Sequence, residues 1–334
     1  MINFYKRIVL LLFLLSFATK YAGAQDAHLS QYEASPMYLN PAMTGMFEGD
    51  YRFNVHYRNQ WPNLVTKPFV TTAMSFDMPY KKVKIGAFVL NSRAGAGSYN
   101  VLNIVFSAAY DYSFKNYPNN HVAGGIQVGA IQKSVNMNNL YFDNQYSNNN
   151  GGSFDPTMSS GENYSSTNIL LPEANIGMLY NYSNPESRIN PFLGFSVLHL
   201  TQPNESFYGG ENKLPRRYIL HGGVKININE RFQLGTHILS MQQTNAKELT
   251  ISLLGYYYFR DSDTYLLLGA TFRKNDASII NTGLKYGNFT YRISYDVNTS
   301  ALQTITNGRG GFELSIVYIM KKINANPLKS CPRL

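Results

Sequence analysis

The amino-acid sequence predicts an all-β protein, a transmembrane antiparallel β-barrel of about fourteen strands of the outer-membrane type. Three observations predict this fold class. Apolar and polar residues alternate with a period of two, the composition is rich in aromatic residues and poor in charges, and short connections alternate with long ones. After the N-terminal region, no apolar run is long enough for a membrane helix.

The alternation is clearest at the two ends of the strand region. In residues 51–58 every odd position is apolar or aromatic and every even position is polar or charged, and residues 289–298 repeat the pattern. Successive side chains on a strand point to opposite faces, so each segment has one apolar and one polar face. The alternation by itself fits a two-sheet sandwich as well. The expected strands span residues 51–59, 70–77, 84–91, 100–112, 121–131, 173–182, 190–198, 218–228, 232–239, 248–258, 265–272, 278–286, 289–298 and 311–320.

The composition and the connections favour the barrel over the sandwich. The chain has 26 Tyr and 20 Phe, and only 15% of its residues are charged. Short connections are expected at 81–82, 229–231, 260–264 and 287–288, and long ones at 132–172, 199–217 and 299–310. Outer-membrane barrels have short periplasmic turns and long external loops. An even number of strands then places both termini in the periplasm.

The chain divides into four expected parts. Residues 1–24 have a short basic start, an apolar run and small residues before Gln25, the pattern of a cleaved signal peptide. Residues 25–50 are expected to form an N-terminal periplasmic or plug segment, because they contain more apolar residues than a free tail needs. Residues 51–322 form the barrel, with the long external loops 132–172 and 199–217. Residues 323–334 form a C-terminal periplasmic tail.

Charge and cysteine content exclude several classes of protein. The signal peptide carries three of the cations that give the chain its formal charge of +9, and no acid. The other Lys and Arg residues are scattered along the strands, so we expect no nucleic-acid partner. Cys331 is the single cysteine, which excludes an intrachain disulfide. We expect this thiol to be inert.

The sequence gives no sign of catalysis or of a bound cofactor. No spacing of Ser and His residues singles out a nucleophile with its base, and the six His residues do not cluster as metal ligands. The glycine-rich stretch 308–311 precedes a strand rather than a helix, so it is not expected to bind phosphate. We therefore predict that the protein is not an enzyme and needs neither a cofactor nor a metal.

The polar faces of the strands supply candidate functional residues. They include several cations, and two interpretations stay open: a lumen that is solvated or salt-bridged, and a basic interior that binds an acidic peptide or selects anions. Trp61, next to a strand end, fits an interfacial anchor. The candidate partner-binding or lumen residues are Arg52, His56, Arg58, Trp61, His199, Gln202, Asn204, Arg216, Arg217, Arg292, Asp296 and Arg309.

Several ordered motifs resemble one known family. The sequence is similar to the PorP/SprF family of outer-membrane proteins of the type IX secretion system of Bacteroidota. Ala27 is a departure, since many members have Pro there. The resemblance covers nearly the whole mature chain. The motifs that carry it lie at residues 25–32, 39–42, 58–62, 199–204, 214–218, 294–298, 308–314 and 331–333.

The resemblance implies a function in protein secretion. Family members work with the type IX translocon, and some support export and surface attachment of large adhesins used in gliding motility, whose C-terminal domains are of type B. It implies that this barrel binds the C-terminal domain of such a protein, with translocon or ring components and outer-membrane lipid as further partners. Two alternatives remain: a structural link between the outer membrane and the periplasmic ring of the machinery, and a passive diffusion porin.

Overall fold

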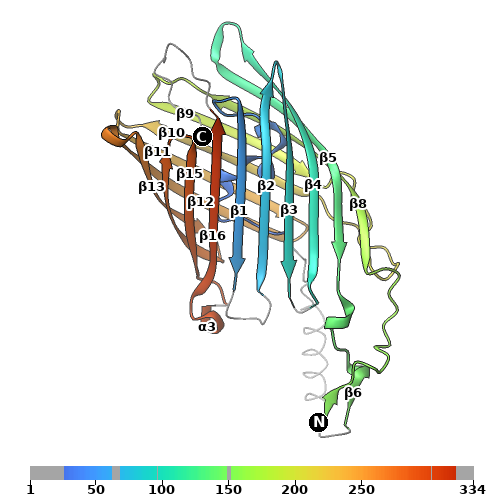
Figure 1. Ribbon diagram of the computed structural model, residues 1–334. Helices are drawn as coiled ribbons and strands as arrows, with labels where there is room; N and C mark the ends of the chain where they lie inside the picture. The colour runs from blue at the N-terminus through green and yellow to red at the C-terminus, as the bar shows by residue number, and fades with distance from the viewer. Residues whose placement is uncertain (1–25, 62–67, 96, 149–151, 302, 321–334) are drawn as a thin grey trace, which may run out of the picture.

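A computed structural model describes residues 26–61, 68–95, 97–148, 152–301 and 303–320 (Figure 1). Fourteen antiparallel strands form a closed barrel, in which β1 pairs with both β2 and β16. The expected signal peptide, the tail 323–334 and Cys331 lie outside the described residues. The barrel strands are β1 (Tyr51–Gln60), β2 (Phe69–Tyr80), β3 (Val83–Ala94), β4 (Tyr99–Phe114), β5 (Tyr117–Ser134), β8 (Asn168–Tyr182), β9 (Ile189–Leu198), β10 (Arg217–Asn227), β11 (Phe232–Gln243), β12 (Ala246–Phe259), β13 (Thr264–Arg273), β14 (Ala277–Tyr286), β15 (Phe289–Asn298) and β16 (Arg309–Met320).

Short elements lie between and before these strands. In the loop between β5 and β8, two strands of two residues each form a separate sheet. Among the described residues, no helix combines the length and the apolar character needed to cross a membrane. The short elements are η1 (Tyr32–Ala34), α2 (Pro36–Leu39), η2 (Pro41–Met43), η3 (Met137–Asn139), η4 (Asp143–Gln145), β6 (Tyr146–Ser147), β7 (Ser153–Phe154), η6 (Arg260–Ser262) and α3 (Gln303–Thr306).

The predicted fold class and strand number are confirmed, and the strand ends differ by a few residues. The expected strand 289–298 is β15 itself. The largest difference concerns β5 and β8, whose ladder runs from Asn120↔Tyr182 to Ser134↔Asn168. The added residues at the end of β5, Gln132 to Ser134, are all polar, and those at the start of β8 include the apolar run Ile169 to Leu171, so neither end alternates although its backbone stays paired. The long loops therefore narrow to 135–167 and 199–216.

The side chains alternate across the barrel wall. On β1, Phe53 is 46% exposed on the outer face, whereas Arg58 is 2% exposed on the inner face. On β15, Tyr291, Ile293 and Tyr295 face outward in the same way. An outer surface of Phe, Tyr, Ile, Leu and Val is one that lipid solvates.

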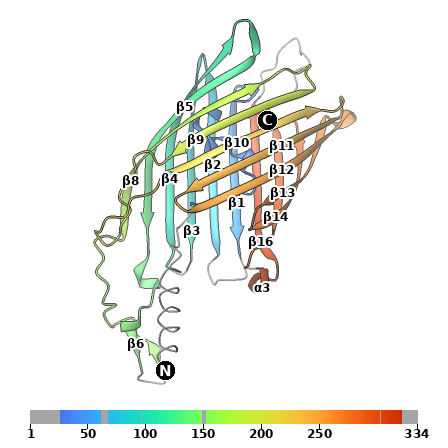
Figure 2. The same cartoon turned by 180° about the vertical axis from the view of Figure 1, so that it is seen from behind.

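The barrel has two mouths of different construction. The loop mouth carries connections 135–167, 199–216 and 299–308, and the turn mouth carries turns 81–82, 115–116 and 287–288. Figures 1 and 2 show the loop with β6 and the short helix α3 at one end of the barrel, and the tip of the β4–β5 hairpin at the other.

Residues 26–50, here called the N-terminal segment, run through the lumen from one mouth to the other. Asp26 contacts His199 and Arg217 at the loop mouth, and the Asp50 amide donates to the Met320 carbonyl at the turn mouth over 2.8 Å. The first described residue therefore lies at the loop mouth, whereas β1 begins and β16 ends at the turn mouth. The reason is apolar burial, since the segment packs inside the wall.

The hydrophobic core of the protein lies between this segment and the wall. The segment turns through η1, α2 and η2 (Figure 1). Its apolar side chains pack against several strands. A closed barrel of this strand number would otherwise enclose water. The segment contributes Leu29, Tyr32, Met37, Tyr38 and Leu39, and the wall contributes Ala73, Phe88, Leu90, Val105, Leu198, Ile219, Leu239 and Met241.

One prediction tests which face of β15 meets lipid. Replacing Ile293 by Arg is expected to lower the free energy of unfolding by about 2–4 kcal/mol, because the cation would face hydrocarbon. The control is Thr290→Arg, whose side chain lines an internal cavity and should cost less. Urea titration in lipid vesicles, followed by the mobility shift of the folded barrel on heating, measures both. Equal losses would contradict the assignment of faces.

Candidate functional site

The most extensive polar site joins the N-terminal segment to β15 and β16. Arg58 lies at its centre and donates to Asp296 over 2.7 Å and to Glu313 over 3.1 Å. It also donates to the Ser30 hydroxyl. The charged side chains of Arg58, Asp296 and Glu313 are all buried, so each charge depends on its partner.

Glu313 holds the backbone of the segment directly. Its carboxylate accepts hydrogen bonds from the amides of Ser30 (2.7 Å) and Gln31 (3.0 Å). The Gln31 side-chain amide donates in turn to the Glu313 carbonyl and to the Ser294 hydroxyl, each over 3.0 Å. His56 lies close by and donates from Nε2 to the Ala34 carbonyl over 3.0 Å. Residues of the wall thus bind both the main chain and the side chains of the segment.

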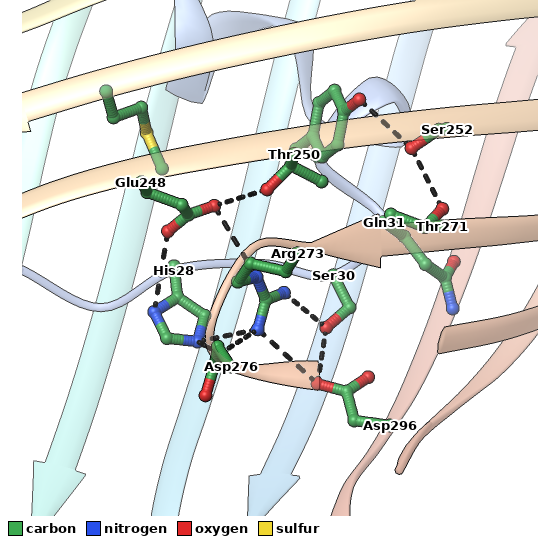
Figure 3. A network of polar contacts seen from close by, with 12 residues as sticks. His28, Ser30, Gln31, Glu248, Thr250, Ser252, Thr271, Arg273, Asp276 and Asp296 are labelled. Carbon is green, nitrogen blue, oxygen red and sulfur yellow. Dashed lines mark hydrogen bonds and ion pairs between the residues drawn. The ribbon is translucent and has the colours of Figure 1, made fainter. Parts of the chain in front are cut away.

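Arg273 extends this site toward the loop mouth (Figure 3). Its guanidinium donates to Asp276 over 2.8 Å and to the Ser30 hydroxyl over 2.9 Å. Glu248 lies 3.5 Å from the Arg273 Nε atom and 3.9 Å from His28. Ser30 therefore contacts Arg58, Arg273 and Asp296, and it is the point where the segment meets three strands.

Two further arginines of the lumen are paired with carboxylates of the same chain. Arg52 donates to Asp77 from Nε (3.0 Å) and Nη2 (2.6 Å), a two-point ion pair. Asp77 also accepts from the Gly45 amide over 2.7 Å. Arg292 lies 3.5 Å from Glu33 of the segment. Of the two interpretations of the lumen charges, these contacts are those of a salt-bridged lumen, because its carboxylates already engage the arginines.

His199 clamps the start of the segment at the loop mouth. It is hydrogen-bonded to Glu173 over 2.9 Å and to Asp26 over 2.8 Å. Burial alone would lower the pKa of His199, but the two carboxylates outweigh it and raise the pKa to about 9. Burial alone would likewise raise the pKa of Asp26, whereas the hydrogen bond and charge of His199 and the charge of Arg217 hold it well below its ordinary value. Arg217 also donates to the Tyr38 hydroxyl over 2.7 Å.

This clamp predicts a pH dependence at the loop mouth. Because folding raises the pKa of His199 above its ordinary 6.5, the clamp is complete below about pH 6.5 and is lost as the pH rises through about 9. The contribution is at most about 3 kcal/mol. Between pH 7 and pH 10, the amides of residues 26–31 in the purified protein should exchange with solvent increasingly faster than the intrinsic pH dependence of exchange alone would give. His199→Gln should exchange fast throughout that range. Exchange of the wild type that follows only its intrinsic pH dependence would contradict the clamp.

A pair of glycines seats the middle of the segment. Gly125 of β5 and Gly177 of β8 are register partners, and the Asn40-Pro41-Ala42 turn lies on them. A Cβ atom at Gly177 would lie 1.9 Å from the Asn40 Oδ1 atom, and one at Gly125 would lie 2.4 Å from the Ala42 nitrogen. Neither glycine could carry a side chain without moving the turn.

A cavity of about 220 Å³ lies between the segment and the strands from β8 through β16 to β1. It is lined by Glu33, Leu39 and Met43 of the segment, and it reaches Asn184 and Lys285 near the turn mouth. The lining mixes apolar residues with charges. No cluster of His, Cys, Asp and Glu residues suited to a metal ion occurs within the described parts of the chain.

The remaining candidate residues lie at the loop mouth and do not converge on the buried site. Trp61 packs edge-on against Phe69 with ring centroids 5.4 Å apart. Asn204 orders its own loop by accepting from the Ser206 and Asn212 amides. Gln202 belongs to the same turn, in which its amide donates to the His199 carbonyl. Arg216 and Arg309 are exposed.

Three carboxylates on the barrel strands pair with candidate cations but lie outside the candidate set drawn from the sequence. Asp77, Glu173 and Glu313 each neutralise a cation of that set. Their signal in the sequence is their place on the polar face of an expected strand. The glycine pair had no such signal, because glycine belongs to neither face.

The loop between β5 and β8 forms an ordered arm outside the barrel. Residues 135–148 and 152–167, here called the arm, include η3, η4 and the β6–β7 sheet. Buried Gln145 organises it by donating to the Met158 carbonyl and accepting from the Phe142 amide. At its base, the Asn136 amide donates to the Gly97 carbonyl over 2.8 Å. Figures 1 and 2 show the arm projecting beyond the strand ends.

Comparisons with solved structures find other barrels at low similarity. The toluene transporter TbuX of Ralstonia pickettii is 10% identical over 85% of this chain and 92% of its own, with a TM-score of 0.49. A Pseudomonas aeruginosa FadL homologue is 11% identical over 85% and 94%, with a TM-score of 0.48. KdgM porin is 7% identical over 80% and 98%, with a TM-score of 0.39. Likenesses of this size say nothing about what this chain binds or transports.

The comparison of the sequence with protein families finds a match over most of the chain. No curated protein matches the chain significantly. Residues 22–318 match the family described as type IX secretion system membrane protein PorP/SprF. A closed antiparallel barrel with an apolar outer face is the form in which strands cross an outer membrane. The protein is therefore an outer-membrane β-barrel, and it belongs to the PorP/SprF family of the type IX secretion system.

Proposed function

We propose that this barrel is a non-enzymatic partner of an exported protein. It binds the C-terminal domain of an adhesin-like surface protein, of type B, and supports the secretion and surface anchoring of that protein. One observation carries the proposal: the chain fills its own lumen, while an ordered arm projects from the loop mouth. Binding residues presented on a rigid scaffold in this way are typical of recognition loops.

The filled lumen separates this proposal from the porin alternative. The segment runs between the two mouths, and its contacts with Asp77, Asp296 and Glu313 are buried. The cavity beside it is lined partly by the segment itself. Diffusion of solutes needs an open lumen, and these contacts oppose one.

A structural link to the periplasmic ring is the second candidate. The N-terminal segment does not support it, because the segment lies inside the barrel. The β4–β5 hairpin does support it, since the ladder between β3 and β4 stops at Val83↔Tyr110 while β4 continues to Phe114. The hairpin therefore extends past β3 at the turn mouth and exposes Phe114 and Tyr117.

The proposed orientation places the loop mouth outside the cell. Long external loops and short periplasmic turns are typical of outer-membrane barrels. An epitope inserted after Asn148 should bind antibody on intact cells, and one inserted after Asn229 should bind only after the outer membrane is opened. The reverse result would invert the orientation and place the arm in the periplasm.

Affinity purification of the native protein, followed by mass spectrometry, tests the proposed function. We expect an exported surface protein, retained through its C-terminal domain, as the main partner. Enrichment of periplasmic ring components in its place would favour the structural link. Recovery of neither, from cells that display type IX cargo, would contradict both.

A further inference from the structure

The arm exposes an aromatic cluster at its β6–β7 sheet. Phe154 lies between Tyr141 and Tyr146, with ring centroids 5.5 Å and 5.4 Å away. The three side chains are 57% (Tyr141), 49% (Tyr146) and 46% (Phe154) exposed. Tyr146 lies on β6, which is beyond the ends of the barrel strands (Figure 1). Apolar groups gathered at an aqueous surface mark binding sites.

The arm is built to hold this cluster in place. Tyr146 and Phe154 are register partners in the β6–β7 sheet, and the Asp155 amide donates to the Gln145 carbonyl over 2.8 Å. At the base, the Ser165 amide donates to the Phe207 carbonyl over 2.8 Å, and the rings of Tyr164 and Tyr208 lie 5.1 Å apart. A surface that is ordered before binding loses less entropy when a partner docks.

The charge of the arm differs in sign from that of the whole chain. Residues 135–167 contain Asp143, Asp155 and Glu162 and no Lys, Arg or His, which gives the loop a formal charge of −3, whereas the chain carries +9. Asp143 and Glu162 are exposed. Complementarity therefore selects a cationic partner surface and opposes the phosphate groups of lipids. The lumen arginines do not reverse this, since they face carboxylates of the wall or of the N-terminal segment.

We propose that the aromatic cluster Tyr141, Tyr146 and Phe154, together with the exposed acids Asp143 and Glu162 of the same arm, is the docking surface for a basic, partly apolar face of a folded protein domain. This inference rests on the proposed function for the identity of that domain, the C-terminal domain of the exported protein. Aromatic side chains supply most of the affinity in such contacts, and complementary charges raise the association rate and the specificity.

Photocrosslinking in intact cells tests the docking surface. The full-length protein carries p-benzoylphenylalanine at position 146, or at position 117 of the turn mouth as the control. We expect position 146 to crosslink an exported protein through a peptide rich in Lys and Arg, and position 117 not to do so. Crosslinks to lipopolysaccharide, or no crosslinks at all, would overturn the proposal.

Matched variants separate the two kinds of contact. Tyr141→Ser, Tyr146→Ser and Phe154→Ser together should reduce co-purification of the exported protein on the order of tenfold or more. Asp143→Lys with Glu162→Lys should abolish the crosslink from position 146. In the same variant, added salt should no longer weaken binding of the exported protein. The matched charge reversal Glu230→Lys with Asp261→Lys, in exposed turns at the other mouth, should leave both unchanged.

The outcomes distinguish this inference from the proposed function. If the wild type retains an exported protein and both arm variants retain it equally, the docking surface is wrong and the proposed function stands. If the wild type retains none, the proposed function fails. If crosslinking at position 146 then also finds no basic protein face, the docking surface fails independently. Heat-modifiable mobility of every variant shows that the barrel is folded.

Discussion

Replacing Arg58 by Met is expected to lower the free energy of unfolding by about 3–5 kcal/mol. The substitution leaves Asp296 and Glu313 buried without the cation that donates to both. Restoring a neutral site should recover much of the loss, so Arg58→Met combined with Asp296→Asn and Glu313→Gln is expected to be more stable than Arg58→Met alone. Urea titration in lipid vesicles measures all three proteins.

The control for Arg58 is an ion pair of similar length at the surface. Arg260 and Glu230 lie 2.7 Å apart, with side chains 63% and 82% exposed. Arg260→Met should change the stability by less than about 1 kcal/mol, because water replaces the lost partner. Similar losses at Arg58 and Arg260 would contradict the buried network.

Displacing the N-terminal segment is expected to open the lumen. The wild-type protein should conduct ions poorly in planar bilayers, because the segment fills the barrel between its mouths. Gly125→Val with Gly177→Val places side chains where the Asn40-Pro41-Ala42 turn now lies. We expect this variant to raise the conductance on the order of tenfold, since a barrel of fourteen strands without filling holds water.

A neighbouring glycine provides the control for this experiment. A Cβ atom at Gly124 would meet no other atom within 4 Å, so Gly124→Val should leave the conductance at the wild-type level. A second variant, in which residues 26–47 are deleted, should conduct like the double glycine variant. Large, steady currents from the wild type would contradict the closed lumen and support the porin alternative.

The barrel was predictable from the sequence because its pattern is local. Alternation along 51–58 and 289–298 assigns each side chain to one face, and a one-residue error in register would invert every assignment. Closure then makes one long-range contact predictable in principle. If the first and last strands pair, Arg58 and Glu313 become register partners, although 255 positions separate them. Asp77 and Glu173 follow from the same alternation.

The contents of the lumen were not predictable by the same means. Residues 26–50 form three short helical turns with no sustained period, so only their apolar content pointed to burial. Their path depends on shape, such as the glycine seat under Asn40, which no periodicity encodes. The β6–β7 sheet was missed for a related reason, because two residues per strand are too few to show alternation.

Surface proteomics of a strain that lacks this gene tests the proposed function most directly. We expect one or a few exported proteins to leave the cell surface, while other type IX cargo remains displayed. The physical reason is that the N-terminal segment occupies the lumen and the proposed docking surface lies on the projecting arm, so loss of the barrel removes a partner and not a general passage. An unchanged set of surface proteins would contradict this account, and loss of all type IX cargo together would favour the structural link.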